Sequence, residues 1–164
     1  MAKEIFSVTD FVNNNGCFDL QFRKDTRHER TNSPTYYRWK AQFIATAPKS
    51  EIKFLEKIKK EIKCGEIAIS KGQARFSVQK IEDITAVVIP YFSKNQLSDN
   101  KKKDFQLWSK GAEIIHKNKG KPLASWKKNE LNSLIEIHKS SAKYKIRSRQ
   151  PKWLDMARVF SKTV

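Results

Sequence analysis

The stretch Phe11-Val12-Asn13-Asn14-Asn15-Gly16-Cys17-Phe18-Asp19-Leu20-Gln21-Phe22 places three asparagines and a glycine directly before an alternating segment. After the glycine, apolar and polar side chains alternate, which predicts a strand with one buried face. Asparagine and glycine both tolerate positive φ, so the Asn-Gly pair is expected to form a turn after a short helix over 7–14. Two interpretations of the asparagines are open: a plain loop entering a strand, or a site where a carboxylate once stood.

Two β-hairpins are predicted from the same alternation. The first pairs residues 17–24 with residues 35–46 across a charged loop. The second pairs residues 66–70 with residues 73–79 across a Lys-Gly turn. In the second hairpin, Ile67 and Ile69 are expected to pair with Phe76 and Val78 on the core face.

Apolar residues three and four positions apart predict the helices. Besides the first one, they cover residues 50–63 (opened by Ser50), 81–93, 101–118 and 126–139, with a short helix at 153–160. Trp39 and Trp108 are interpreted as core residues. The expected fold is therefore α+β, with one four-stranded antiparallel sheet packed on helices.

The charge balance points to a polyanionic partner. The 164 residues include 34 Lys and Arg against 17 Asp and Glu, a formal net charge of +17. Such a field attracts nucleic acid and makes the folded chain repel itself. A membrane partner fits poorly, because no long basic amphipathic helix and no apolar run of about 20 residues is present. The two cysteines lack the spacing of a zinc site, so no metal or other cofactor is expected.

The order of these features resembles the LAGLIDADG homing endonucleases. Residues 8–18, VTDFVNNNGCF, stand where members of that family read roughly LAGFVDGEGCF. Further matches are Gly65 after its helix, RFSV at 75–78, IPYF at 89–92 and KKKDF at 101–105. The similarity spans about residues 6–140 and contains one copy of the motif, which is typical of the homodimeric, single-motif subgroup. It implies an αββαββα domain over residues 1–142, followed by a basic C-terminal tail over residues 143–164.

Departures from the family motif imply a degenerate site. The metal-binding carboxylate of the family falls on Asn15, and Asn13 replaces a second acid. A neutral amide attracts Mg²⁺ much more weakly than a carboxylate does, so no metal is expected unless the protein is an active endonuclease. Asp10 and Asn14 replace small residues of the motif helix, which argues against a homodimer. Either Lys101 or Lys102 is the expected remnant of the family's active-site lysine.

The candidate nucleic-acid-binding residues are polar and basic. They belong to the solvent face of the predicted sheet, to the loops beside it and to the tail. Lys and Arg suit phosphates, whereas amides suit base edges. The set is Asp19, Gln21, Arg23, Arg27, Arg30, Arg38, Lys40, Gln42, Lys71, Arg75, Lys101, Lys102, Lys103, Arg147 and Arg149.

The leading hypothesis is a catalytically inactive LAGLIDADG-derived protein that binds structured RNA rather than DNA. It would be a structural component of an organellar ribosome or a similar ribonucleoprotein, with other proteins of that particle as partners, or a splicing maturase. The alternative is an active metal-dependent homing endonuclease that cleaves a long DNA site, with Asp10 or Asp19 supplying the carboxylate. A dimeric DNA-binding repressor is a third interpretation. Abundant Lys, Asn and Ile are typical of an AT-rich genome and favour an organellar, mitochondrial location; another intracellular location is the alternative.

Overall fold

The computed structural model of the chain describes residues 6–26, 35–144 and 157–159. In chain order, the helices and strands are α1 (Val8–Asn15), β1 (Gly16–Thr26), β2 (Thr35–Pro48), α2 (Ile52–Ile62), β3 (Glu66–Ser70), β4 (Gln73–Val78), α3 (Ile81–Asp83), α4 (Ile89–Lys94), α5 (Asp99–Lys117) and α6 (Lys128–Ser141). A π-helical turn at Ile84–Val88 joins α3 to α4, so one helical segment covers the range predicted over 81–93. Of the helix predicted at 153–160, residues 157–159 are helical and the remainder lies outside the described residues.

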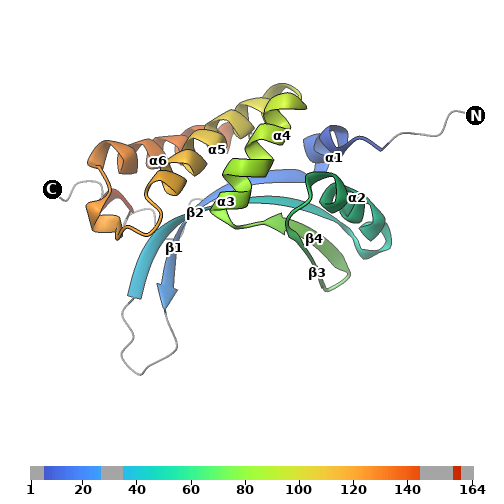
Figure 1. Ribbon diagram of the computed structural model, residues 1–164, viewed down its shortest axis with the longest axis horizontal. Coiled ribbons are helices and arrows are strands. Elements are labelled where there is room, and N and C mark those ends of the chain that lie inside the picture. The colour runs from blue at the N-terminus through green and yellow to red at the C-terminus, as the bar shows by residue number, and fades with distance from the viewer. Residues whose placement is uncertain (1–5, 27–34, 145–156, 160–164) are drawn as a thin grey trace, which may run out of the picture.

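The four strands form one antiparallel sheet in the order β1-β2-β4-β3. Figure 1 shows the helices on one side of the curved sheet, while the other side carries no helix among the described residues. The predicted α+β fold, with one four-stranded antiparallel sheet packed on helices, is confirmed. None of the helices in the described ranges is long and apolar enough to cross a membrane.

An aromatic cluster fills the space between the sheet and the helices. The ring of Phe18 lies 5.3 Å from Phe43, 5.6 Å from Phe92, 5.2 Å from Phe105 and 5.1 Å from Trp108, measured between centroids. All five side chains are buried, and the predictions that Trp108 and Trp39 belong to the core are confirmed. The cluster joins β1 and β2 to α4 and α5, so it fixes the helices to the sheet.

The junction between α1 and β1 explains the glycine of the opening stretch. Gly16 is extended, with φ −94° and ψ 156°, so the expectation of a positive-φ turn is wrong. The physical reason for glycine is a close approach. A Cβ on residue 16 would lie 2.6 Å from Val12 Cγ1 and 2.8 Å from the Val12 carbonyl oxygen. Glycine therefore lets α1 pass directly into β1 without an intervening loop.

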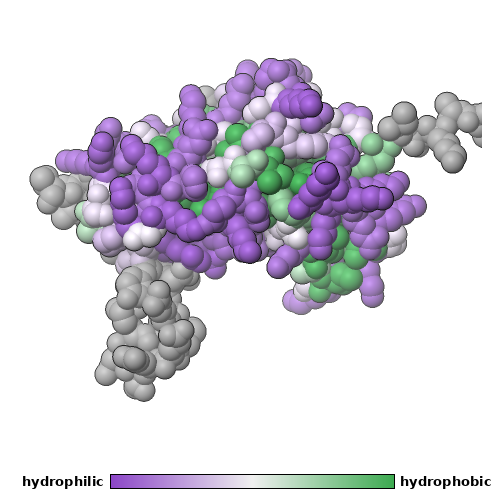
Figure 2. Space-filling view, viewed as in Figure 1, coloured by the Kyte–Doolittle hydropathy of each residue, from purple (hydrophilic) through white to green (hydrophobic). Residues whose placement is uncertain are grey.

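The second hairpin forms, but its register differs from the prediction. Ile67 pairs with Phe76 and packs against the core, whereas Ile69 pairs with Ala74 rather than Val78. Ile69 is 52% exposed, so its prediction as a core residue is wrong. The reason is that β3 is an edge strand whose far end extends beyond the helical layer. Figure 2 shows a hydrophobic patch over this hairpin, while hydrophilic side chains cover most of the same view.

Two helices begin later than predicted. Ser50 lies in a 3-10 turn and α2 starts at Ile52, because β2 runs two residues further than predicted before the chain reverses. Trp126 is extended and α6 starts at Lys128. The Trp126 indole Nε1 donates to the carbonyl oxygen of Lys121 at 3.1 Å, which ties this residue to the preceding loop instead of the helix.

An ion pair at the junction of α5 and α6 predicts a pH-dependent stability. The Glu130 carboxylate lies 3.2 Å from Lys117 Nζ and accepts a hydrogen bond from Asn118 Nδ2 at 3.5 Å. Burial alone would raise the pKa of Glu130, but the bonds from Lys117 and Asn118 outweigh it, and the pKa lies below its ordinary value. We therefore expect Glu130→Gln to lower the free energy of unfolding by about 1 kcal/mol at neutral pH.

The sign of this pH dependence follows from the lowered pKa. A depressed carboxyl pKa stabilises the folded state above the ordinary pKa, and the contribution is lost as pH falls through the folded value. Urea unfolding of wild type and the Glu130→Gln variant should therefore differ at neutral pH and converge in acid, where the wild-type carboxyl group is protonated in the folded state as well. A difference of equal size at both pH values would show that the ionised carboxylate is not the cause.

Candidate nucleic-acid interface

The uncovered face of the sheet presents polar side chains in register. The apolar side chains of β1 and β2 are buried under the helices, so the intervening residues project from the opposite face. Two arginines, a glutamine–lysine pair and an acid–amide pair face one another across the two strands. The cross-strand pairs are Arg23–Arg38, Gln21–Lys40 and Asp19–Gln42.

One carboxylate organises the amides of this face. Asp19 Oδ2 accepts hydrogen bonds from Gln42 Nε2 at 2.8 Å and from Gln21 Nε2. Gln42 is only 5% exposed, so its amide is held in place. Three of the predicted binding residues are thus engaged with one another. They fix the local surface, and the basic side chains around them carry its charge.

The basic part of the face extends from β2 toward β4. Lys40 Nζ donates to Gln79 Oε1 at 2.7 Å, and Gln79 Nε2 donates to Ser77 Oγ at 3.3 Å. Arg75 is exposed on β4, and Lys71 is exposed in the turn between β3 and β4. Gln79 and Ser77 were not among the predicted binding residues. The alternation along the fourth strand indicated their outward direction and could have identified them.

The remaining predicted residues are distributed differently. Lys103 is exposed on α5, on the helical side of the molecule. Arg27, Arg30, Arg147 and Arg149 lie outside the described residues. The structure therefore brings together the sheet residues of the predicted set, and Lys103 is not part of that face.

The three asparagines end α1 with neutral amides. Asn13 Oδ1 accepts a hydrogen bond from the backbone N–H of Ser98, just before α5, at 3.1 Å. Asn14 and Asn15 donate through Nδ2 to carbonyl oxygens one turn earlier in α1, at 2.9 and 3.4 Å. Both are exposed. The end of the motif helix thus offers amide groups to solvent and no carboxylate.

Lys101 reaches this junction and Lys102 does not. Lys101 Nζ donates to the carbonyl oxygen of Gly16 at 2.6 Å and is partly buried. Lys102 Nζ donates to Gln96 Oε1 at 3.0 Å. Of the two lysines considered as the remnant of an active-site lysine, the geometry places Lys101 beside the motif.

These donors fit Mg²⁺ poorly. Mg²⁺ prefers carboxylate oxygens, whereas the end of α1 offers amides beside the ammonium of Lys101, which repels cations. Asp10 is exposed in the first turn of α1, and Asp19 accepts the two glutamine amides on the sheet face. Within the described ranges, no group of three or more His, Cys, Asp and Glu residues could hold a metal ion.

A helix that enters its strand through a glycine, and a sheet that bears its helices on one face, define a homing-endonuclease-like nucleic-acid-binding fold. Residues 9–112 match the model of the LAGLIDADG endonuclease family. The chain belongs to that family and carries a single copy of its motif.

Solved structures agree with this assignment of the fold. The crystal structure of the homing endonuclease I-TnaI matches with a TM-score of 0.69 at 17% identity, covering 94% of this chain and 95% of that one. I-SmaMI bound to cleaved DNA matches at 0.68 and 20% identity, covering 92% of this chain and 46% of that one. I-AabMI bound to uncleaved DNA matches at 0.68 and 20%, covering 96% and 48%. The chain thus spans about half the length of the last two. No curated protein matches the sequence significantly.

Proposed function

We propose that the protein binds nucleic acid through the uncovered face of its sheet and does not cleave it. The observation that carries this proposal is the combination of a basic sheet face with a motif helix that ends in asparagine. A net charge of +17 attracts phosphates whether or not a catalytic site is present. The likeness to I-SmaMI and I-AabMI, both solved bound to DNA, supports nucleic acid as the partner.

The loss of cleavage is argued from the chemistry of the end of α1. Metal-dependent phosphodiester cleavage needs anionic ligands that hold the ion beside the scissile phosphate. Asn15 is exposed there but neutral, and the Lys101 ammonium lies at the next residue, Gly16. A phosphate fits this arrangement better than a cation does. The end of α1 therefore favours binding of nucleic acid without cleavage.

The exposed surface of α1 favours a monomer, and a monomer favours RNA as the target. Asp10 and Asn14 are exposed one turn apart on this helix. Packing α1 against its copy across a two-fold axis would bring the two Asp10 carboxylates together, at a cost of several kcal/mol unless they are paired. One chain of this protein matches 46% of the I-SmaMI chain, so a monomer corresponds to about half of that enzyme. We therefore infer that the target is structured RNA. The curved sheet of one chain can recognise such an RNA by its shape and by the positions of its phosphates.

The same proposal extends to the biological setting. A basic chain that acts as a monomer suits a permanent place in a ribonucleoprotein particle, such as an organellar ribosome, with other proteins as neighbours. Splicing assistance is the other role compatible with RNA binding. A mitochondrial location is proposed on composition alone, which is rich in Lys, Asn and Ile.

Restoring the acid at Asn15 tests the loss of catalysis. Wild type and the Asn15→Asp variant are incubated with Mg²⁺ and a library of genomic DNA fragments, and new ends are sequenced. We expect no new ends from wild type. We also expect none from the variant, because Asn13 is neutral as well and a monomer supplies only one such position. Asn14→Asp adds the same charge at an exposed neighbour and serves as the control.

Two results would change this account. Discrete, Mg²⁺-dependent breaks made by wild type would contradict it and return the protein to the active homing endonucleases. Breaks made by the Asn15→Asp variant alone would mean that the scaffold is intact and that only the ligand was lost.

A further inference from the structure

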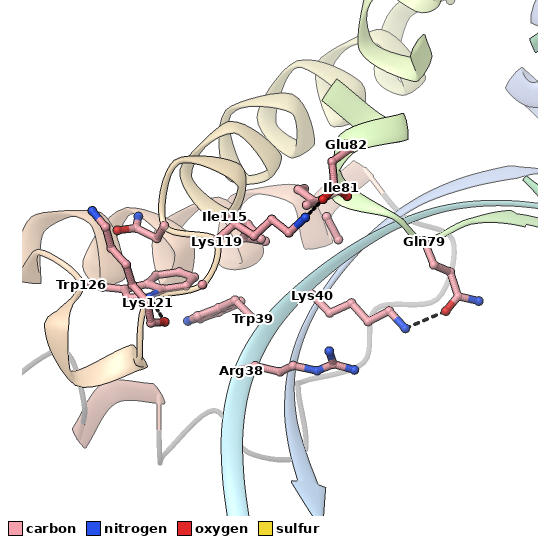
Figure 3. Close-up of a pocket in the computed structure, with 13 residues that line it drawn as sticks. Arg38, Trp39, Lys40, Gln79, Ile81, Glu82, Ile115, Lys119, Lys121 and Trp126 are labelled. Atoms are coloured by element: carbon pink, nitrogen blue, oxygen red, sulfur yellow. Dashed lines mark hydrogen bonds and ion pairs between the residues drawn. The ribbon is translucent and has the colours of Figure 1, made fainter. Parts of the chain in front are cut away.

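A pocket of about 370 Å³ opens beside the sheet face, and the family motif does not account for it. Its walls come from β2, from the start of α3 and from the loop between α5 and α6, as Figure 3 shows. The volume is near the lower end of ordinary ligand pockets, which span about 300–1,000 Å³. There is room for one nucleotide rather than for a base-paired segment.

The pocket exists because β2 extends past its neighbour. β4 pairs with β2 only from Phe43 to Pro48, so the earlier part of β2 has β1 on one side and this pocket on the other. Arg38 and Lys40 project from the sheet face and also line the pocket. A nucleic acid bound on the face can therefore reach the pocket without leaving the surface.

The inner wall is aromatic and apolar. Trp39 is 3% exposed and belongs to the core, whereas Trp126 is partly buried and faces the pocket. The bond from Trp126 Nε1 to the Lys121 carbonyl oxygen fixes the plane of the indole. Ile115 completes this wall. A fixed indole beside apolar side chains is a stacking surface, and it accepts any base because every base has a π-face.

The rim is cationic. Arg38, Lys40, Lys119 and Lys121 line the pocket, and Glu82 is the one carboxylate among the lining residues that the structure describes. The Lys119 ammonium contacts the Glu82 carboxylate, so this acid is already neutralised. The remaining three cations leave an excess of positive charge where a phosphate would enter.

We propose that this pocket takes one unstacked nucleotide of a bound RNA, with its base against Trp126 and its phosphate at the cationic rim of the pocket. The inference rests on the proposed function, because it needs RNA on the sheet face. It adds what that function leaves open: the protein distinguishes RNA with an unpaired nucleotide from a continuous duplex. Base recognition by stacking makes the preference independent of sequence.

The test uses two RNA hairpins that differ only by a single bulged uridine, measured by fluorescence anisotropy with the full chain. Wild type is expected to bind the bulged hairpin about tenfold more tightly, since stacking one base on an aromatic side chain contributes about that much. Trp126→Ala is expected to remove this preference, and Trp126→Phe to retain most of it. With 4-thiouridine at the bulge, ultraviolet crosslinking is expected to mark residues of the pocket wall, mapped by mass spectrometry.

A charge variant covers the case in which Trp126→Ala fails to fold. Lys121→Glu at the exposed rim is expected to abolish the preference for the bulge. Lys128→Glu, an exposed position outside the pocket, is expected to weaken both hairpins equally and keep it. Equal binding of both hairpins by wild type would overturn the pocket while leaving the proposed function standing. Binding of neither hairpin would overturn both.

Discussion

Replacing Arg38, Lys40 and Arg75 together by glutamate is expected to lower the affinity for nucleic acid about a hundredfold or more. These side chains lie on the uncovered sheet face, on β2 and β4. When a phosphate contact is lost, fewer counterions leave the nucleic acid on binding. The slope of log K against log salt should therefore become shallower by about 1 per residue replaced. Anisotropy titrations at several salt concentrations measure both quantities.

The matched control moves the same charge to the helical side. Lys110, Lys128 and Lys139 are exposed on α5 and α6, and their replacement by glutamate lowers the net charge by the same amount. We expect a much smaller loss of affinity and a nearly unchanged salt slope. Equal losses in the two triple variants would mean that total charge, and not the sheet face, determines binding.

Replacing Phe18 by alanine is expected to lower the free energy of unfolding by about 4 kcal/mol. Its ring contacts four other aromatic rings from β2, α4 and α5, and it is 1% exposed. Truncation leaves a cavity that rigid neighbours cannot fill, and buried Phe→Ala changes typically cost 3–5 kcal/mol. Urea unfolding followed by circular dichroism measures the change.

The exposed Ile69 supplies the control for this prediction. At 52% exposure on the edge strand, Ile69→Ala should change stability by no more than about 0.5 kcal/mol. A large loss of stability in Ile69→Ala would mean that Ile69 belongs to the core, as the alternation of the sequence predicted. A small loss at Phe18 would contradict the aromatic cluster as the link between sheet and helices.

The fold was predictable because alternation and helical periodicity agree along most of the chain. The strands of both hairpins carry apolar residues at every second position, and burial selects that face. Ile69 shows the limit of such patterns, which indicate the side of a strand but not where the covering layer ends. Gly16 shows another limit, since a glycine forced by close approach to Val12 looks the same in sequence as a glycine in a turn.

The site was predictable only in part, because its distant contacts are tertiary. The motif located Asn15, and alternation located the basic residues of β1 and β2. The reach of Lys101 rather than Lys102 to Gly16 depends on how α5 crosses the sheet, which no local pattern reports. The pocket wall at Trp126 depends on how the loop after α5 meets the free edge of β2. Neither arrangement leaves a periodic signal in the sequence.

The most direct measurement of the central claim is to recover the protein from its native source and sequence the nucleic acid that travels with it. Lysate is sedimented under conditions that keep particles intact, and bound RNA and DNA are sequenced separately. The account predicts co-migration with a ribonucleoprotein particle and enrichment of one structured, uncleaved RNA. A free protein that enriches one DNA site, with ends cut in the presence of Mg²⁺, would contradict it.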